Sequence, residues 1–89
     1  MPAKGSDSMT TFKSVYRTVD NLLRKWGERG VALSGETNDC WIFKGHIVEG
    51  DVLSGSCIIV SKDDGNMHLL NTGNPEDREV MYSAVIIER

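Results

Sequence analysis

The stretch Ser56–Thr72 (SCIIVSKDDGNMHLLNT) constrains the fold more than any other part of this 89-residue chain. Two apolar runs, Cys57–Val60 and Met67–Leu70, flank a polar centre that contains Asp64 and Gly65. Apolar, β-branched residues on both sides of an Asp-Gly pair are the strongest short-range signal for a β-hairpin. The sequence therefore predicts an antiparallel pair of strands here.

The turn sets the register expected for this hairpin. A three-residue Asp-Asp-Gly loop, with positive φ at its glycine, places Ile59 opposite Leu69 and Ile58 opposite Leu70. Both faces of the hairpin then carry apolar side chains. We therefore expect it to be an interior pair of strands.

An amphipathic helix is predicted before the strands. Its apolar residues recur at steps of three and four, which is the spacing of one helix face: Phe12, Val15, Tyr16, Val19, Leu22, Leu23 and Trp26. Thr10 or Thr11 is expected to cap its start, and Gly27 or Gly30 to end it. We expect the whole stripe, Trp26 included, to pack on a sheet.

Two further strands and a turn follow this helix in the sequence. Val31–Glu36 is a modest strand, and Cys40–Val48 is a stronger one with Trp41 and Phe43 on the same face. The Thr-Asn-Asp sequence between them favours a turn, so the two strands are predicted to form a hairpin.

The rest of the chain divides into a leader, a loop, a helix and a tail. Met1–Met9 is polar and predicted to be a disordered leader, and Glu49–Gly55 is predicted to be a loop. Asn74 followed by proline and two acids predicts a short helix over Pro75–Tyr82. Ala84–Ile87 is either an edge strand or a continuation of that helix.

Together these elements predict an α+β fold in a single domain over residues 10–89. The N-terminal amphipathic helix packs on a small antiparallel β-sheet of about four strands, with a short second helix near the C-terminus. We expect both helices on one face of the sheet, which gives two layers.

The composition indicates a small cytoplasmic protein. Two cysteines are too few for a disulfide-stapled secreted scaffold. The N-terminus has no apolar signal-peptide core, and no apolar run is long enough to cross a bilayer. We therefore expect no membrane association.

The net charge of −3 is unevenly distributed. Residues 10–29 carry five basic and two acidic side chains, whereas residues 36–88 carry ten acidic and three basic ones. An acidic region repels nucleic acid and attracts basic surfaces, so no nucleic-acid partner is expected. The alternative interpretation is that these acids only keep a small protein in solution.

The residues that could carry chemistry are few, and we expect no enzyme, no cofactor and no metal site. Cys40, His46, Cys57 and His68 lack the closely spaced ligand pairs of zinc motifs. His68 could act as a base only with a partner, for which Asp51 or the Asp63-Asp64 pair are the alternatives. The two aspartates are better explained as turn formers.

The segment IIVSKDDGNMHLLNTGNPE resembles the YrhB-like family, also called immunity protein 35. The similar features are the apolar strand, the glycine-containing turn, His68 followed by apolar residues, Thr72, and the acidic helix start at Pro75. The detailed similarity covers residues 55–76. The resemblance implies a small non-enzymatic cytoplasmic protein that binds and blocks a bacterial toxin; a chaperone-like role is also implied.

These observations favour a binding protein with a protein partner, most concretely an immunity protein that blocks a basic toxin. The acids expected nearest the interface lie in predicted loops and turns: Asp51, Asp63, Asp64, Glu76 and Asp77. The alternative is a phage- or plasmid-borne accessory or structural protein that acts through homo-oligomerisation. A homodimer would then form through an edge strand at Ala84–Ile87.

Overall fold

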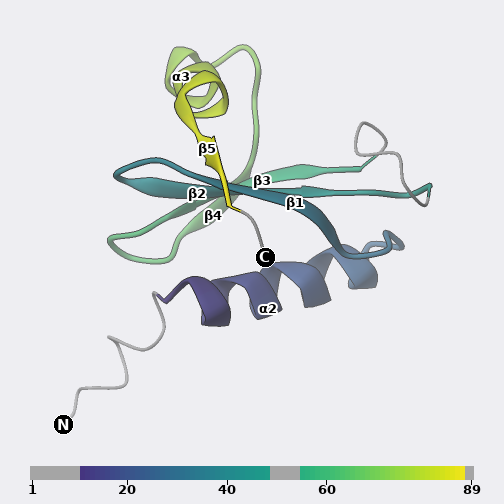
Figure 1. Ribbon diagram of the computed structural model, residues 1–89. Coiled ribbons are helices and arrows are strands. Elements are labelled where there is room, and N and C mark those ends of the chain that lie inside the picture. The colour runs from purple at the N-terminus through teal and green to yellow at the C-terminus, as the bar shows by residue number, and fades with distance from the viewer. Residues whose placement is uncertain (1–10, 49–54, 88–89) are drawn as a thin grey trace, which may run out of the picture.

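A computed structural model of the chain describes residues 11–48 and 55–87 (Figure 1). Its elements are, in chain order, helix α2 (Phe12–Lys25), strands β1 (Val31–Glu36), β2 (Cys40–Gly45), β3 (Cys57–Ser61) and β4 (Met67–Leu69), helix α3 (Pro75–Ser83) and strand β5 (Val85–Ile86). The strands form one antiparallel sheet in the order β4-β3-β2-β1-β5. The predicted α+β fold is confirmed.

The sheet has five strands rather than about four. The additional strand is β5, which resolves the two alternatives for the tail in favour of an edge strand. Ile86 lies opposite Gly35 of β1, and the Ile87 N–H donates to the Ser34 carbonyl at 2.9 Å. The chain thus returns, after α3, to the edge of the sheet that lies farthest from β4.

Helix α2 begins and ends close to where the sequence predicts. The Thr11 hydroxyl accepts a hydrogen bond from the Ser14 N–H at 3.3 Å, and Gly27 follows the helix with φ +93°. The prediction that Trp26 lies in the core is wrong, since its side chain is 47% exposed. Trp26 is the C-cap of α2, where the backbone leaves the helical path that keeps the apolar stripe on the sheet.

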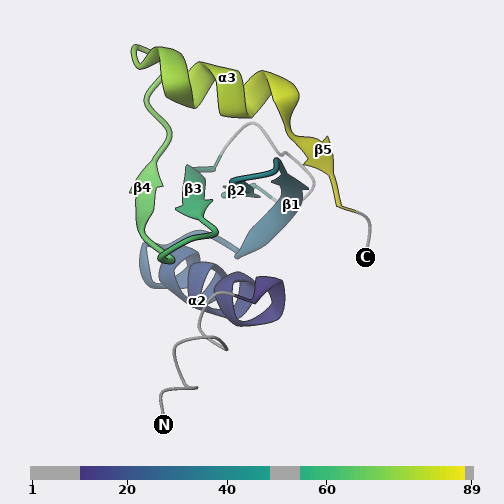
Figure 2. The same cartoon turned by 90° about the vertical axis from the view of Figure 1, so that its left-hand side faces the viewer.

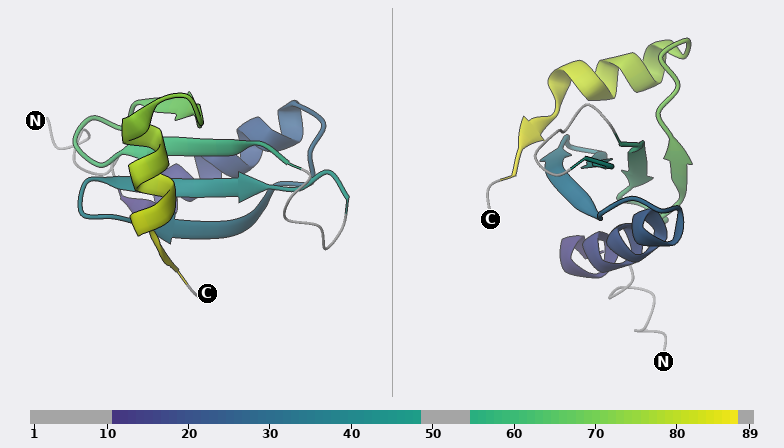
Figure 3. Two further views of the ribbon diagram at one scale, coloured as in Figure 1. Left: turned by 90° about the horizontal axis from the view of Figure 1, so that it is seen from above. Right: turned by 90° about the vertical axis from the view of Figure 1, so that its right-hand side faces the viewer.

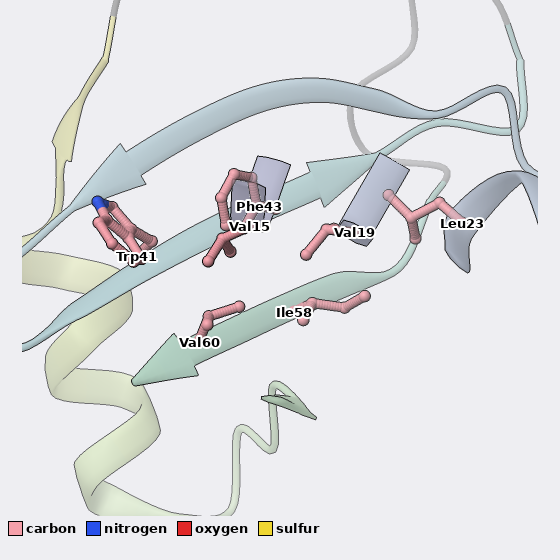
Figure 4. Packing of buried hydrophobic residues seen from close by; sticks show 7 residues of the cluster. All are labelled: Val15, Val19, Leu23, Trp41, Phe43, Ile58 and Val60. Carbon is pink, nitrogen blue, oxygen red and sulfur yellow. The ribbon is translucent and has the colours of Figure 1, made fainter. Parts of the chain in front are cut away.

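The hydrophobic core lies between α2 and one face of the sheet (Figure 4). Its buried members alternate along the central strands and recur at helical spacing along α2: Val15, Val19, Leu23, Trp41, Phe43, Ile58 and Val60. Phe43 is fully buried and stacks on Phe12 with a centroid separation of 5.8 Å. The expectation that Trp41 and Phe43 face the helix is confirmed.

The two helices lie on opposite faces of the sheet, so the expectation of a single covered face is wrong (Figure 2). Helix α2 occupies the face of Trp41 and Phe43. Helix α3 crosses the other face, running from the β4 side to the β5 side. The crossing has a simple cause: the chain must pass from one edge of the sheet to the other, and α2 already covers the first face.

The β1–β2 hairpin forms as predicted, with Ser34 opposite Phe43 and Glu36 opposite Trp41. Strand β2 ends at Gly45, three residues before the predicted end at Val48. The Gly45 N–H still donates to the Ser56 carbonyl at 2.8 Å. The side chains of Ile47 and Val48 are exposed, so these two apolar residues lie outside the core.

The β3–β4 hairpin forms, but its register differs from the prediction by one residue. Ile58 lies opposite Leu69, and Val60 opposite Met67. The turn therefore holds one residue more, because the Lys62 N–H leaves the hairpin and donates to the Asp39 carbonyl at 2.9 Å.

The hairpin is also not an interior pair. Strand β4 is three residues long and forms the edge of the sheet, where Leu69 is 54% exposed. The apolar residues of this hairpin therefore do not all enter the core, and only β3 is buried between two neighbouring strands.

Helix α3 has the predicted start and extends one residue beyond the predicted end. The Asn74 side chain accepts a hydrogen bond from the Glu76 N–H at 2.9 Å, and Pro75 occupies the first turn. The predicted leader Met1–Met9 and most of the predicted loop Glu49–Gly55, including Asp51, lie outside the described residues.

Candidate functional site

Four acidic side chains gather at one end of the sheet. The β1–β2 and β3–β4 turns lie at the same end, because β1 and β3 run in the same direction (Figure 3). We call this group the acidic end; it comprises Glu36, Asp39, Asp63 and Asp64, all of them exposed. Two of the predicted partner-binding acids, Asp63 and Asp64, are therefore neighbours of two acids that the prediction did not include.

Lys62 connects the two turns of the acidic end. Its Nζ atom donates to Glu36 Oε2 and to the Thr37 carbonyl, both at 2.7 Å. The same ammonium lies 5.4 Å from the centroid of the Trp41 ring. The acidic end thus holds four carboxylates and one ammonium group, so its negative charge is only partly balanced.

The Asp63-Asp64 pair has the turn-forming role that the sequence predicts. Asp64 accepts hydrogen bonds from the Asn66 N–H at 3.0 Å and from the Asn66 side-chain amide at 2.9 Å. Gly65 adopts φ +75°, as the turn requires. His68 does not contact these two aspartates, and its bonding partner lies elsewhere.

His68 and Asp77 form a side-chain hydrogen bond between β4 and α3. The His68 Nε2 atom lies 2.9 Å from Asp77 Oδ1, and Asp77 Oδ2 accepts the Asn71 N–H at 2.9 Å. The hydrogen bonds from His68 and Asn71 lower the pKa of Asp77 more than burial raises it. Asp77 is only 4% exposed, so its carboxylate fastens α3 to the sheet rather than facing a partner.

The two remaining predicted acids stand in different positions. Glu76 is exposed in the first turn of α3, next to the buried Asp77. Asp51 lies outside the described residues. The structure thus brings Asp63 and Asp64 together, keeps Glu76 apart from them, and removes Asp77 from the surface.

Four exposed apolar side chains lie at the C-terminal end of α3 and on β5. They are Met81 and Tyr82 of α3 and Val85 and Ile86 of β5, and we call this group the α3–β5 surface. Tyr82 is 77% exposed and Val85 is 71% exposed. Val85 lies opposite Glu36 in the sheet, and one depression is lined by both residues. Val85 is therefore the member of this group that adjoins the acidic end, whereas Ile86, the next residue of the strand, points to the opposite face of the sheet.

Both cysteines are half-buried strand residues without a disulfide, as the sequence suggests. Burial raises the pKa of the Cys40 and Cys57 thiols, which disfavours the reactive thiolate. Over residues 11–48 and 55–87, His, Cys, Asp and Glu side chains do not gather in groups of three or more that could hold a metal ion.

Sequence reasoning missed three features of this region. The joint position of the two turns follows from consecutive hairpins, so the strand order alone could have placed Glu36 and Asp39 beside Asp63. The α3–β5 surface depends on where α3 crosses the sheet, and no local sequence pattern indicates the position of that crossing. The His68–Asp77 pair joins residues nine positions apart on different elements, and no motif marks it.

Comparison with models of protein families, with curated proteins and with solved structures finds no match for this chain. Among the described helices, neither is long and apolar enough to cross a membrane.

Proposed function

We propose that the protein is a non-enzymatic cytoplasmic binding protein, most concretely an immunity protein that binds and blocks a basic toxin. The observation that carries the proposal is that the exposed Val85 of the α3–β5 surface lies beside Glu36 of the acidic end. Protein interfaces commonly have an apolar centre with aromatic side chains and a polar rim. We expect the exposed Val85 and Tyr82 in the apolar part of such an interface and Glu36, beside Val85, on its rim.

The charge of the acidic end favours a basic partner. Complementary charges accelerate the encounter of two proteins and disfavour partners of the same sign. The resemblance of residues 55–76 to the YrhB-like family supports a toxin as that partner. Asp39 and Asp63 are the acids best suited to a test, because both are exposed and neither carboxylate makes a hydrogen bond among those found in the described residues.

The experiment is a growth-protection assay in the native host. Each gene adjacent to the one encoding this chain is expressed alone and together with it. We expect one adjacent product to inhibit growth, and co-expression to restore it. The proposal is wrong if no adjacent product is toxic, or if the protein gives no protection and does not bind the toxic product.

Matched variants then test the surface. The triple variant Asp39→Lys/Asp63→Lys/Tyr82→Ala is expected to lose protection while remaining folded by circular dichroism. The control Lys25→Glu reverses an exposed charge in the last turn of α2, at the other end of the sheet from the acidic end, and is expected to keep protection. Equal protection by both variants would show that the toxin binds elsewhere.

A second candidate function is homo-oligomerisation through β5. This strand forms an edge of the sheet and exposes Val85 and Ile86, so a second copy could pair with it across a two-fold axis. Light scattering at increasing protein concentration separates the two functions. A dimer that becomes a monomer on Val85→Lys supports oligomerisation, whereas a monomer at all concentrations rules it out.

A further inference from the structure

The face of the sheet that α3 crosses contains a cavity of about 410 Å³. It lies between the sheet, the C-terminal part of α3 and β5, on the side opposite to the hydrophobic core. Most of its lining is apolar: Leu33, Gly35, Ile42, Cys57, Leu70, Met81, Ala84 and Ile86. Ligand pockets in proteins are typically about 300–1,000 Å³ and predominantly apolar, so this cavity has the size and character of one.

Helix α3 cannot close the cavity by settling onto the sheet, because it is fixed at both ends. At its start, Asp77 is bound by His68 and by the Asn71 N–H. At its end, the chain enters β5 and pairs with β1. Ile59, opposite His68, is buried, so the sheet is well covered at the N-terminal end of α3 and open toward its C-terminal end.

Small residues in the lining bring α3 close to the sheet at one point and leave space beside it. A Cβ at Gly35 would meet Ile42 Cγ2 at 3.0 Å and Ala84 Cβ at 3.3 Å, so the glycine allows the end of α3 to lie close to β1. Ala84 and Cys57 are small residues elsewhere in the lining. A larger apolar residue at either of these two positions would fill part of the cavity and bury more apolar surface.

Lys44 is the only charged side chain among the described residues that line the cavity. It is half-buried, and its Nζ atom donates to the Gly55 carbonyl. An ammonium group carries three N–H donors, so this bond leaves capacity to bind an anion. A cation beside an apolar cavity is complementary to a molecule with one negative charge and a short apolar body.

We propose that this cavity binds a free monocarboxylate with a short apolar chain, its carboxylate on Lys44 and its chain between α3 and the sheet. Burial of the apolar chain and a charge-assisted hydrogen bond from Lys44 to the carboxylate would both stabilise the complex. This site is distinct from the acidic end, although Met81 and Ile86 belong both to its lining and to the α3–β5 surface. It requires neither a toxin nor a second copy of the chain.

The test is an NMR titration of the full chain with octanoate, compared with 1-octanol and octylammonium, which share its chain but not its charge. Octanoate is expected to shift the amide signals of Gly35, Cys57 and Ala84 and to saturate. The neutral and cationic compounds are expected to bind at least about tenfold more weakly, the factor for loss of one charge-assisted hydrogen bond. Equal binding of all three, or no saturable shift, overturns the proposal.

Two variants and a control assign the binding to the site. Lys44→Met is expected to weaken octanoate about tenfold and to leave 1-octanol unchanged. Lys13→Met removes an exposed lysine from α2 and is expected to change neither. Ala84→Leu retains Lys44 but fills the cavity, and is expected to abolish binding of both compounds even if Lys44→Met fails to fold. Undiminished octanoate binding by folded Ala84→Leu overturns the proposal.

Discussion

The Nε2 atom of His68 lies 2.9 Å from Oδ1 of Asp77 and joins edge strand β4 to the first turn of α3. His68 is 53% exposed on its side chain, whereas the Asp77 side chain is 6% exposed. A carboxylate can only accept hydrogen bonds, so His68 donates its Nε2–H. The second carboxylate oxygen accepts the Asn71 N–H. This single buried carboxylate therefore holds together β4, the following turn and α3.

Asp77→Asn is expected to lower the free energy of unfolding by about 1–3 kcal/mol, the cost of leaving a buried hydrogen-bonding group without its partner. An asparagine side chain has one acceptor oxygen, while His68 and Asn71 both present donors. Urea denaturation at neutral pH measures the change. Glu76→Gln is the matched control, because Glu76 is exposed in the same turn and its loss costs less than about 1 kcal/mol. Equal losses in the two variants would contradict the role of Asp77.

The stability of the protein is expected to fall at acidic pH, in part through Asp77. Its pKa in the folded chain is below the ordinary value of 3.8. The unfolded chain therefore binds protons more readily in that range. The stabilisation by the carboxylate is complete above the ordinary pKa and is lost as the pH falls through 3.8 toward the folded-state pKa.

The variant Asp77→Asn tests this pH dependence. Unfolding midpoints measured from neutral pH down to about pH 3 should decline less steeply in the variant than in the unmodified protein. Asp20 supplies part of the remaining decline. Burial raises the pKa of Asp20. The hydrogen bonds from the Val31 N–H and from Arg24, together with the positive charge of Arg24, lower it by more than burial raises it. Parallel curves for the two proteins would show that Asp77 does not contribute.

The elements that the sequence predicted correctly are those marked by a pattern within a single segment of the chain. The apolar stripe of α2 and the alternation of Trp41 and Phe43 lie within single elements, so periodicity located both and placed them in one core. The Asn74 cap and Pro75 likewise defined the start of α3. Trp26 shows the limit, because one residue beyond the helix the same spacing no longer points to the sheet.

The errors arose from contacts between distant segments. The register of the β3–β4 hairpin depends on Lys62, whose N–H bonds to Asp39 in the other hairpin. The burial of Asp77 depends on which face α3 crosses, and that depends on β5 pairing with β1. Asp63 and Asp64 were placed correctly at an exposed turn, since turn chemistry is local. The acidic end and the cavity exist only in the assembled fold.

Glu28→Gln is expected to destabilise the fold by about 1–3 kcal/mol. The Glu28 carboxylate accepts the Ser56 N–H at 3.0 Å and the Ser56 hydroxyl at 2.5 Å, and thereby joins the segment after α2 to the start of β3. Glutamine offers one acceptor oxygen to these two donors. Chemical denaturation measures the loss.

Two further variants separate this contact from a general effect of charge. Glu79→Gln removes an exposed carboxylate from α3 and is expected to change stability by no more than about 0.5 kcal/mol. In a chain that already carries Ser56→Ala, Glu28→Gln should lower the free energy of unfolding by less, because the effects of substitutions at two residues in contact are not additive. Full additivity of the two changes would show that the contact does not stabilise the protein.

Gly65→Ala is expected to lower the free energy of unfolding by about 1–2 kcal/mol, because a side chain in the left-handed region places its Cβ too close to the following carbonyl. Gly65 has φ +75° in the β3–β4 turn, where its N–H donates to the Ser61 carbonyl at 2.9 Å. Gly65→Asn should cost less than Gly65→Ala, since asparagine enters this region more readily.

Gly73→Ala is the matched control: Gly73 is an exposed loop glycine without positive φ, and its change is expected to cost no more than about 0.5 kcal/mol. Thermal denaturation of the three variants gives the order, and a Gly65→Ala variant as stable as Gly73→Ala would mean that the turn does not require a left-handed residue.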